Sequence, residues 1–185
     1  MRLIEMEIAR RDWQRMICGC GKHAGHLAEN LLRLAGHGPS PEPSHVSFEE
    51  HVWSPVGLRE PAPVVASVAL AALAGDMDLA ARQWFLDLLH SLVAGEGTDW
   101  VSAGRGLDLP KMCQDVAVQG MWLLYEEVMS NRSVNTAGTA FEILTVVEPD
   151  RDRLQRVREI AAAWLPVCCR TGLCDEDFDR SDGSR

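Results

Sequence analysis

Basic residues are scarce in this sequence, and lysine is almost absent. Eighteen basic side chains, of which only Lys22 and Lys111 are lysines, stand against 27 acidic ones, and the net charge is −9 with neutral histidines. A nucleic-acid-binding protein needs clustered Lys and Arg to neutralise phosphates, so this balance argues against a nucleic-acid partner. An acidic surface is compatible with a basic protein partner, although it also serves plain solubility.

Long apolar segments and a secretory signal are also missing. The longest apolar run, Ala62–Ala74, is interrupted by Pro63 and Ser67 and is shorter than the roughly 20 residues that span a bilayer. The first residues, Met1–Glu7, lack the apolar core of a secretion signal. Without a secretory context, the six cysteines are expected to be reduced thiols. We therefore expect a cytoplasmic protein without a membrane partner.

Sequence motifs of common enzyme sites are absent as well. The chain has no G-x-x-x-x-G-K-[ST] loop, no strand-borne G-x-G-x-x-G, no H-E-x-x-H and no G-x-S-x-G. The segment Gly104-Arg105-Gly106 is interpreted as a loop between helices. We therefore expect a protein that is not an enzyme, and no catalytic residue is assigned.

Helical periodicity is what the sequence does contain, and it is clearest after residue 61. Asp78 is expected to cap one helix, and Ser133 or Asn135 another. No strand is predicted. Apolar residues recur at helical spacing in five segments, which are Val64–Ala74, Leu79–Ala94, 110–130, 133–147 and 150–164.

The first 60 residues are expected to be irregular and to cap one end of the helical core. Two short helices are predicted within them, His26–Ala35 and Ser47–Trp53, the second with Ser47 as its cap and acidic residues in its first turn. The single domain is divided into an irregular cap (1–60), a helical-repeat core (61–166) and a cysteine-containing acidic tail (167–185) that is expected to be largely disordered.

A weak internal repeat supports a stack of helical hairpins. Residues 63–96 align with 118–151 without a gap, and each copy is a helix, a short polar turn and a helix. Such a unit is typical of an α-solenoid, in which neither helix buries its face alone. Two unrelated hairpins of similar length would look the same. The predicted fold is all-α, a short α-solenoid of stacked antiparallel hairpins plus a terminal helix.

Three stretches carry a resemblance to a known family: Phe48–Trp53, Pro61–Val65 and Arg82–Leu89. A short helix, a proline-led apolar helix and an Arg-opened, leucine-rich helix in this order resemble the HEAT-like repeat proteins common in actinobacteria. The resemblance covers about residues 48–165. It implies a HEAT-like fold and a protein-binding role without catalytic residues. Small proteins of this kind look like immunity proteins that neutralise a toxin of interbacterial competition.

One local cluster has the composition of a metal site. Thiolate and imidazole are ligands of tetrahedral Zn²⁺, and intervening glycines let the backbone curl around an ion. The candidate ligands are Cys18, Cys20, His23 and His26. Their C-x-C-x2-H-x2-H spacing departs from the usual zinc finger. Two or three of them are easier to combine with His37, His45 or His51. The alternative is a glycine-rich turn with ordinary side chains and no cofactor.

Three further cysteines, Cys168, Cys169 and Cys174, precede the acidic end of the chain. They are interpreted either as a thiol switch or as buried or idle thiols near a frayed terminus.

Acidic residues at or just before the expected turns form the predicted partner-binding surface. They are Glu49, Glu50, Glu60, Asp76, Asp78, Glu96 and Asp99. Stacked hairpins are expected to align their turns along one edge, where an acidic face steers a basic partner such as a nuclease toxin. We therefore predict a non-enzymatic protein-binding protein, an immunity protein for a cognate toxin. A general scaffold or regulator is the alternative, and a small metal-binding helical protein or an unrecognised enzyme is the third.

Overall fold

The computed structural model describes residues 2–36 and 47–173, which form ten helices and one two-stranded sheet. The all-α prediction is therefore confirmed. No helix within these two ranges is long and apolar enough to cross a membrane. The elements in chain order are α1 (Leu3–Ala9), α2 (Gly25–Leu34), β1 (Trp53–Ser54), β2 (Gly57–Leu58), α3 (Ala62–Leu73), α4 (Leu79–Val93), α5 (Trp100–Gly104), α6 (Leu109–Gln119), α7 (Met121–Met129), α8 (Val134–Val147), α9 (Arg151–Ala161) and α10 (Val167–Thr171).

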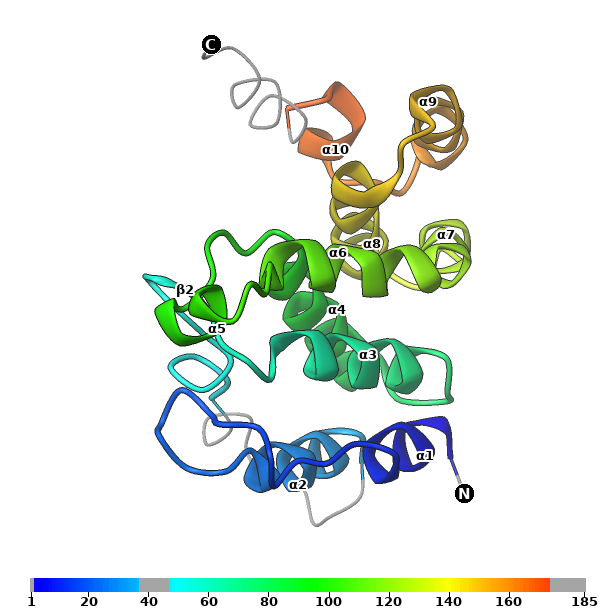
Figure 1. Cartoon of the computed structure of the whole chain (residues 1–185). Coiled ribbons are helices and arrows are strands. Elements are labelled where there is room, and N and C mark those ends of the chain that lie inside the picture. The colour runs from blue at the N-terminus through cyan, green and yellow to red at the C-terminus, as the bar shows by residue number, and fades with distance from the viewer. Residues whose placement is uncertain (1, 37–46, 174–185) are drawn as a thin grey trace, which may run out of the picture.

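The helices are stacked in layers that follow the order of the chain (Figure 1). Helices α1 and α2 form one end, α3 and α4 the next layer, and α6, α7 and α8 the layer after that, while α9 and α10 close the other end. Helix α3 packs against α1, α4 and α6, and α8 packs against α4 and α7. The stacked helices that the sequence predicts are thus present.

Short polar side chains set the starts of the main helices, as the sequence indicates. The side chains of Asp78, Ser133 and Asp150 each accept a hydrogen bond from a backbone N–H three residues further on, at the starts of α4, α8 and α9. The buried faces of α4 and α8 bring Phe85 and Phe141, both fully buried, into the core. Local capping and apolar periodicity are therefore sufficient to define these helices.

A buried ion pair joins α4 to the next hairpin. One terminal nitrogen of Arg82 donates to Glu127 on α7 at 2.9 Å and to the carbonyl of Leu73, and the other donates to the carbonyl of Gly75. Arg132 donates to the same carboxylate at 2.7 Å. Glu127 is 2% exposed, so its charge depends on these two partners. The turns after α3 and α7 are thereby held next to each other.

The single helix predicted over 110–130 is wrong, because the chain breaks at Gly120. Helix α6 ends at Gln119 and α7 begins at Met121. A Cβ atom at Gly120 would lie 2.5 Å from one terminal carbon of Leu70 on α3. Glycine weakens the helix at this point, and the lack of a side chain permits the close approach of Leu70 from another layer.

The N-terminal end is more regular than the predicted cap. Helix α1 is an addition to the prediction, and it packs on α3. The predicted helix Ser47–Trp53 is absent from the described residues 47–53; a turn there leads into β1, which pairs antiparallel with β2. The expectation of no strand was therefore wrong. Leu58 also exchanges backbone hydrogen bonds with Gly97 and Asp99, so a distant segment induces the extended backbone.

Two further helices occur where the sequence predicts none. Helix α5 lies next to the expected loop at Gly104–Gly106, and α10 occupies the start of the predicted tail. The remainder of that tail, residues 174–185, lies outside the described residues, as do His37, His45 and Cys174.

The approach of Leu70 to Gly120 generates a stability prediction. We expect Gly120→Ala to lower the free energy of unfolding by about 1–3 kcal/mol, because the new methyl group overpacks against Leu70. Gly104→Ala is the matched control: no atom lies within 4 Å of its added Cβ, and we expect no loss. Urea denaturation of both variants checks this, and equal stability of the two would contradict the close approach.

Candidate metal centre

Two cysteines and two histidines from three separate segments converge at the N-terminal end of the stack. Cys18 and Cys20 lie in the loop between α1 and α2, His26 lies in the first turn of α2, and His51 lies in the turn before β1. One ligand atom from each of the four lies within 4.8 Å of all the others. The residues therefore form a Cys2His2 cluster.

The distances within this cluster are close to those between the ligands of one tetrahedral ion. Ordinary Zn–S and Zn–N bonds place neighbouring ligand atoms about 3.3–3.8 Å apart. The Sγ of Cys18 lies 3.5 Å from Nε2 of His26 and 3.1 Å from Nδ1 of His51. The two ring nitrogens are 3.1 Å apart, and Sγ of Cys20 lies 4.0 Å from Nε2 of His26. Shifts of a few tenths of an ångström would complete the site.

His23, which the sequence places among the ligands, is not part of the cluster. Its side chain is exposed, and its backbone forms a bridge with Ile17. Its carbonyl oxygen lies 3.0 Å from Nδ1 of His26. With the proton of His26 on Nδ1, this hydrogen bond turns the lone pair of Nε2 toward the two thiols, as outer partners of metal-bound histidines do. His51, one of three alternatives named from the sequence, occupies the fourth position instead.

The backbone holds the two ligand-bearing segments in direct contact. The N–H of Gly19 donates to the carbonyl of His51 at 2.9 Å, and the N–H of Cys18 donates to the carbonyl of Lys22 at 2.8 Å. A Cβ atom at Gly19 would lie 2.0 Å from the carbonyl oxygen of Glu50. Only glycine permits this approach, so the residue between the two cysteines is as important to the geometry as the ligands.

The surroundings of the cluster affect the protonation of its members. Burial raises the pKa of the Cys18 thiol to about 11. A hydrogen bond from the backbone of Lys22 lowers the pKa of Cys20. Burial, followed by the nearby imidazole of His26, lowers the pKa of His51. A neutral imidazole is the form that binds metal, and a metal ion displaces the thiol protons on binding.

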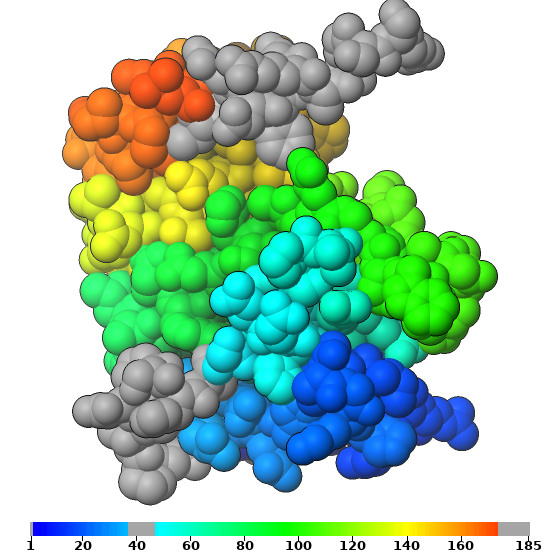
Figure 2. Space-filling model, turned by 90° about the vertical axis from the view of Figure 1, so that its left-hand side faces the viewer, coloured from blue at the N-terminus to red at the C-terminus, as the bar shows by residue number. Residues whose placement is uncertain are grey.

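A surface hollow of about 620 Å³ lies beside the cluster. Cys18 and Gly19 line one side of it, and α5 lines the other with Trp100, whose side chain is 82% exposed. The Arg105–Glu60 ion pair, at 2.6 Å, spans its wall. Figure 2 shows residues 47–60 in cyan on this side of the molecule, between the blue N-terminal segment and the green helices. We name the surface hollow beside the cluster the Trp100 hollow.

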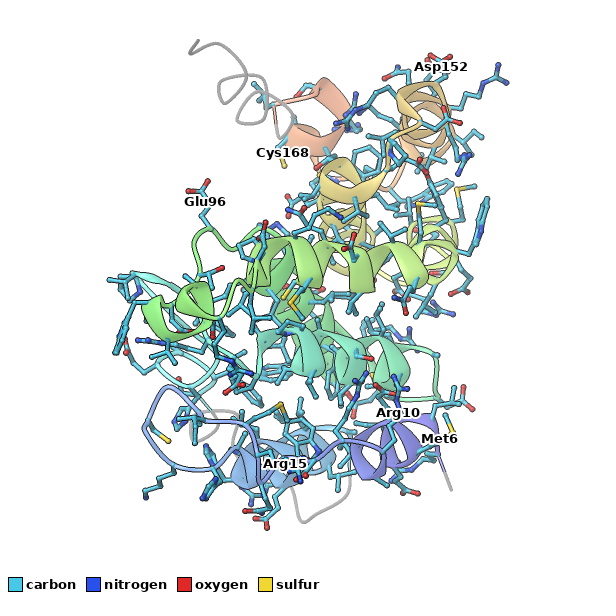
Figure 3. All side chains as sticks on the ribbon, in the orientation of Figure 1. Met6, Arg10, Arg15, Glu96, Asp152 and Cys168 are labelled. Atoms are coloured by element: carbon cyan, nitrogen blue, oxygen red, sulfur yellow. The ribbon has the colours of Figure 1, made fainter. Side chains whose placement is uncertain are left out.

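The predicted acidic surface does not lie along a single edge. Asp76 and Asp78 precede α4, whereas Glu96 and Asp99 follow it, and 15 helical residues separate the two ends by about 22 Å. Figure 3 shows Glu96 on the side opposite the α3–α4 turn. The prediction that the turns align is therefore wrong for this pair, because successive turns of antiparallel helices lie at opposite ends.

Three of these acidic residues are also engaged within the protein, since Asp78 caps α4 and Asp99 and Glu60 have partners of their own. Asp99 is 8% exposed and caps α5 by accepting from the N–H groups of Val101 and Ser102, so its predicted exposure is wrong. Glu60 binds Arg105 and accepts from the N–H of Ile17. Glu49, Glu50 and Glu96 are exposed.

The close approach at Gly19 generates a second prediction. We expect Gly19→Ala to weaken zinc binding at least tenfold, because the methyl group pushes the cysteine loop away from His51. His23→Ala, in the same loop but with an exposed imidazole outside the cluster, is expected to bind zinc as the wild type does. Competition with a chromophoric chelator measures both affinities. An unchanged affinity in Gly19→Ala would mean that the two segments need not touch.

Comparisons with protein-family models, with curated proteins and with solved structures found no match for this chain. The resemblance to HEAT-like repeat proteins over about residues 48–165 therefore stays a prediction.

Proposed function

We propose that this chain is a non-enzymatic, zinc-binding helical protein that recognises a protein partner. One structural Zn²⁺ ion, held by Cys18, Cys20, His26 and His51, orders the end of the stack that carries the partner surface. The observation that carries this proposal is the convergence of the four ligand atoms within 4.8 Å of one another.

The donor set favours zinc and a structural role. Two thiolates and two imidazoles are a usual combination for structural Zn²⁺, whereas Mg²⁺ and Ca²⁺ prefer oxygen ligands. Four protein ligands complete a tetrahedral shell, and a catalytic zinc keeps a position open for water or substrate. A closed Cys2His2 set therefore supports a role in folding.

The ion would join segments that have little regular structure of their own. Residues 10–24 and 48–58 are mostly turns, with one short pair of two-residue strands. The second segment nevertheless contributes Phe48, Val52 and Leu58 to the core. Since the unfolded chain has no preformed site, the free energy of metal binding adds to that of folding. The ion thus stabilises the burial of these three side chains.

The partner surface we propose is the Trp100 hollow. An exposed tryptophan at the rim of a hollow is the kind of residue that dominates binding energy at protein interfaces. Val101, 49% exposed, lies next to it, and both line the hollow with Cys18. The metal cluster and the partner surface therefore share the cysteine loop, and both need this loop to be ordered.

The partner class we propose is a basic toxin domain that the chain neutralises, in line with the resemblance to small immunity proteins. Glu49, Glu50 and Glu96 are exposed, and the backbone of Leu58 in β2 bonds to Gly97 and Asp99, next to Glu96. The hollow itself is lined by Arg15, Arg59 and Arg105 beside Glu60 and Asp99, so the negative charge that would speed association with a basic partner comes from the three exposed glutamates outside the hollow. A general scaffold or regulator remains the alternative function.

Zinc content is the first test of this proposal. We expect the purified chain to retain about one tightly bound zinc ion without added metal, and to lose it in His26→Ala and His51→Ala, because structural zinc is not removed by ordinary purification. His23→Ala is the matched control, since its imidazole lies outside the cluster, and it is expected to retain the ion. Elemental analysis measures the zinc content of each protein.

The effect of a chelator on thermal stability tests the same zinc site. A ligand present at a thousand times its Kd stabilises the folded state by about 4 kcal/mol, which corresponds to roughly 8–16 °C in Tm for a chain of this size. We expect a strong chelator to lower the Tm of the wild type by such an amount and to lower that of His26→Ala by less, because this variant lacks the site. Less than about one zinc per five wild-type chains, with no effect of chelator, would overturn the zinc site.

The partner surface is tested with two exposed tryptophans. We expect Trp100→Ala to weaken binding to the cognate toxin domain, which is to be sought first among the genes beside this one, at least tenfold, as loss of an interface anchor does. Trp122→Ala on α7 is the matched control: its ring is 69% exposed but lies under Arg153, outside the Trp100 hollow. Calorimetric titration gives both affinities, and protection of cells that express the toxin gives the activity.

The outcomes separate the alternatives. Binding and protection that depend on Trp100 support the immunity role and the surface. Binding that depends on Trp122 instead would keep the role and move the surface to α7. No binding to any toxin of the same genome, and no protection, would leave the general scaffold as the function.

A further inference from the structure

A second group of metal-ligand atoms lies at the opposite end of the stack. Cys168 and Cys169, both on α10, place their Sγ atoms 3.9 Å apart. The Sγ of Cys169 lies 3.8 Å from Oε1 of Glu142 on α8, and all three ligand atoms lie within 4.8 Å of one another. Figure 3 shows Cys168 near the end of the molecule that is farthest from Arg15, whose segment carries the first cluster.

The group combines ligands from separate helices in a protected position. Cys169 is fully buried, and Cys168 and Glu142 are half-buried. The other oxygen of Glu142, Oε2, lies 4.0 Å from Nε2 of His90 on α4. A carboxylate that faces two thiols with one oxygen and an imidazole with the other has the surroundings of a ligand with an outer partner.

We propose that Cys168, Cys169 and Glu142 bind a second Zn²⁺ ion, with His90 as the outer partner of the carboxylate. Around a tetrahedral zinc ion, two thiolates lie about 3.8 Å apart, and a thiolate and a carboxylate oxygen about 3.5 Å. The observed separations of 3.9 and 3.8 Å are close to these values. Three protein ligands leave the fourth position to water, so this ion exchanges more readily than the first.

A disulfide between the two cysteines is the main competing use of the thiols. Disulfides join residues whose Cα atoms are about 4.4–6.8 Å apart, whereas neighbouring Cα atoms across a trans peptide bond are about 3.8 Å apart. Cys168 and Cys169 are neighbours within α10, and the structure has no cis peptide bond among its described residues. The helix therefore favours a shared metal ion over a covalent link.

The proposed ion would hold a short helix in place. Helix α10 has five residues, and it packs on α8 and α9. A helix of this length is not stable by itself. An ion shared between α10 and Glu142 would fasten the helix to the last complete layer, just as the first ion would fasten the N-terminal loop. The proposal does not depend on the function proposed above.

Zinc titration of the full-length chain, reduced and freed of metal, tests this proposal. We expect two equivalents to bind to the wild type, and one to the double variant Cys168→Ser/Cys169→Ser. His26→Ala is also expected to bind one, since it loses only the first site. Cys113→Ser, with a buried thiol on α6 outside both groups, is the control and is expected to bind two. Cobalt spectra distinguish the two thiolate sites.

In this zinc titration, the variants that lose only the first site and those that lose only the second site are therefore distinguishable. Two equivalents in the double serine variant, or a single equivalent in the wild type that disappears in His26→Ala, would overturn the second site. So would an oxidised Cys168–Cys169 pair, seen as a mass lower by two hydrogens in the proteolytic peptide that carries both residues, from protein kept in air.

A milder variant covers the case in which the double serine change unfolds the chain. Glu142→Gln keeps the size of the half-buried side chain and removes the anionic ligand. We expect it to retain the helical circular dichroism spectrum and to bind the second equivalent at least tenfold more weakly. Unchanged affinity for that equivalent would overturn the assignment of Glu142 as a ligand.

Discussion

Helix α3 is apolar on nearly every side, and the layers around it are arranged to cover it. Its neighbours are α1, α4 and α6, and Val65, Val68 and Leu73 are among its buried residues. A helix of this kind loses stability wherever water reaches it. The N-terminal segment is therefore a required layer of the stack, because α1 covers the face of α3 that no later helix reaches.

The N-terminal segment must therefore stay packed on α3, although it has little regular structure to hold it there. Helix α1 has seven residues, too few to be stable alone. Its buried Glu7 accepts hydrogen bonds from Arg11 and from Ser67 on α3. Burial alone would raise the pKa of Glu7, but the hydrogen bonds from Arg10, Ser67 and Arg11 lower it to about 2. The charged contact thus fixes α1 to α3, while the loop after α1 carries Cys18 and Cys20 of the cysteine and histidine cluster.

The sequence is informative where structure depends on nearby residues and fails where it depends on distant ones. Asp78, Ser133 and Asp150 cap helices with their own side chains, and these helix starts are predicted correctly. The close packing of Gly120 on Leu70 and the backbone contact of β2 with Gly97 join distant segments. Both contacts join residues that are about 40–50 positions apart, and no local pattern indicates them.

The two groups of metal-ligand side chains also differ in how far nearby residues predict them. Cys18, Cys20 and His26 lie within nine residues of one another, and this local grouping of ligand side chains predicts a candidate metal site. The sequence does not distinguish His51 from the other histidines, and only the fold brings its turn against Gly19. Glu142 and the Cys168–Cys169 pair are separated by about 26 residues and carry no recognisable spacing. A stack of helices buries its middle layers from both sides but its end layers from one side only. Both groups lie at ends of this stack, beside the terminal helices α1 and α10, which have seven and five residues, so a cross-link at either end would fasten a helix that is too short to be stable alone.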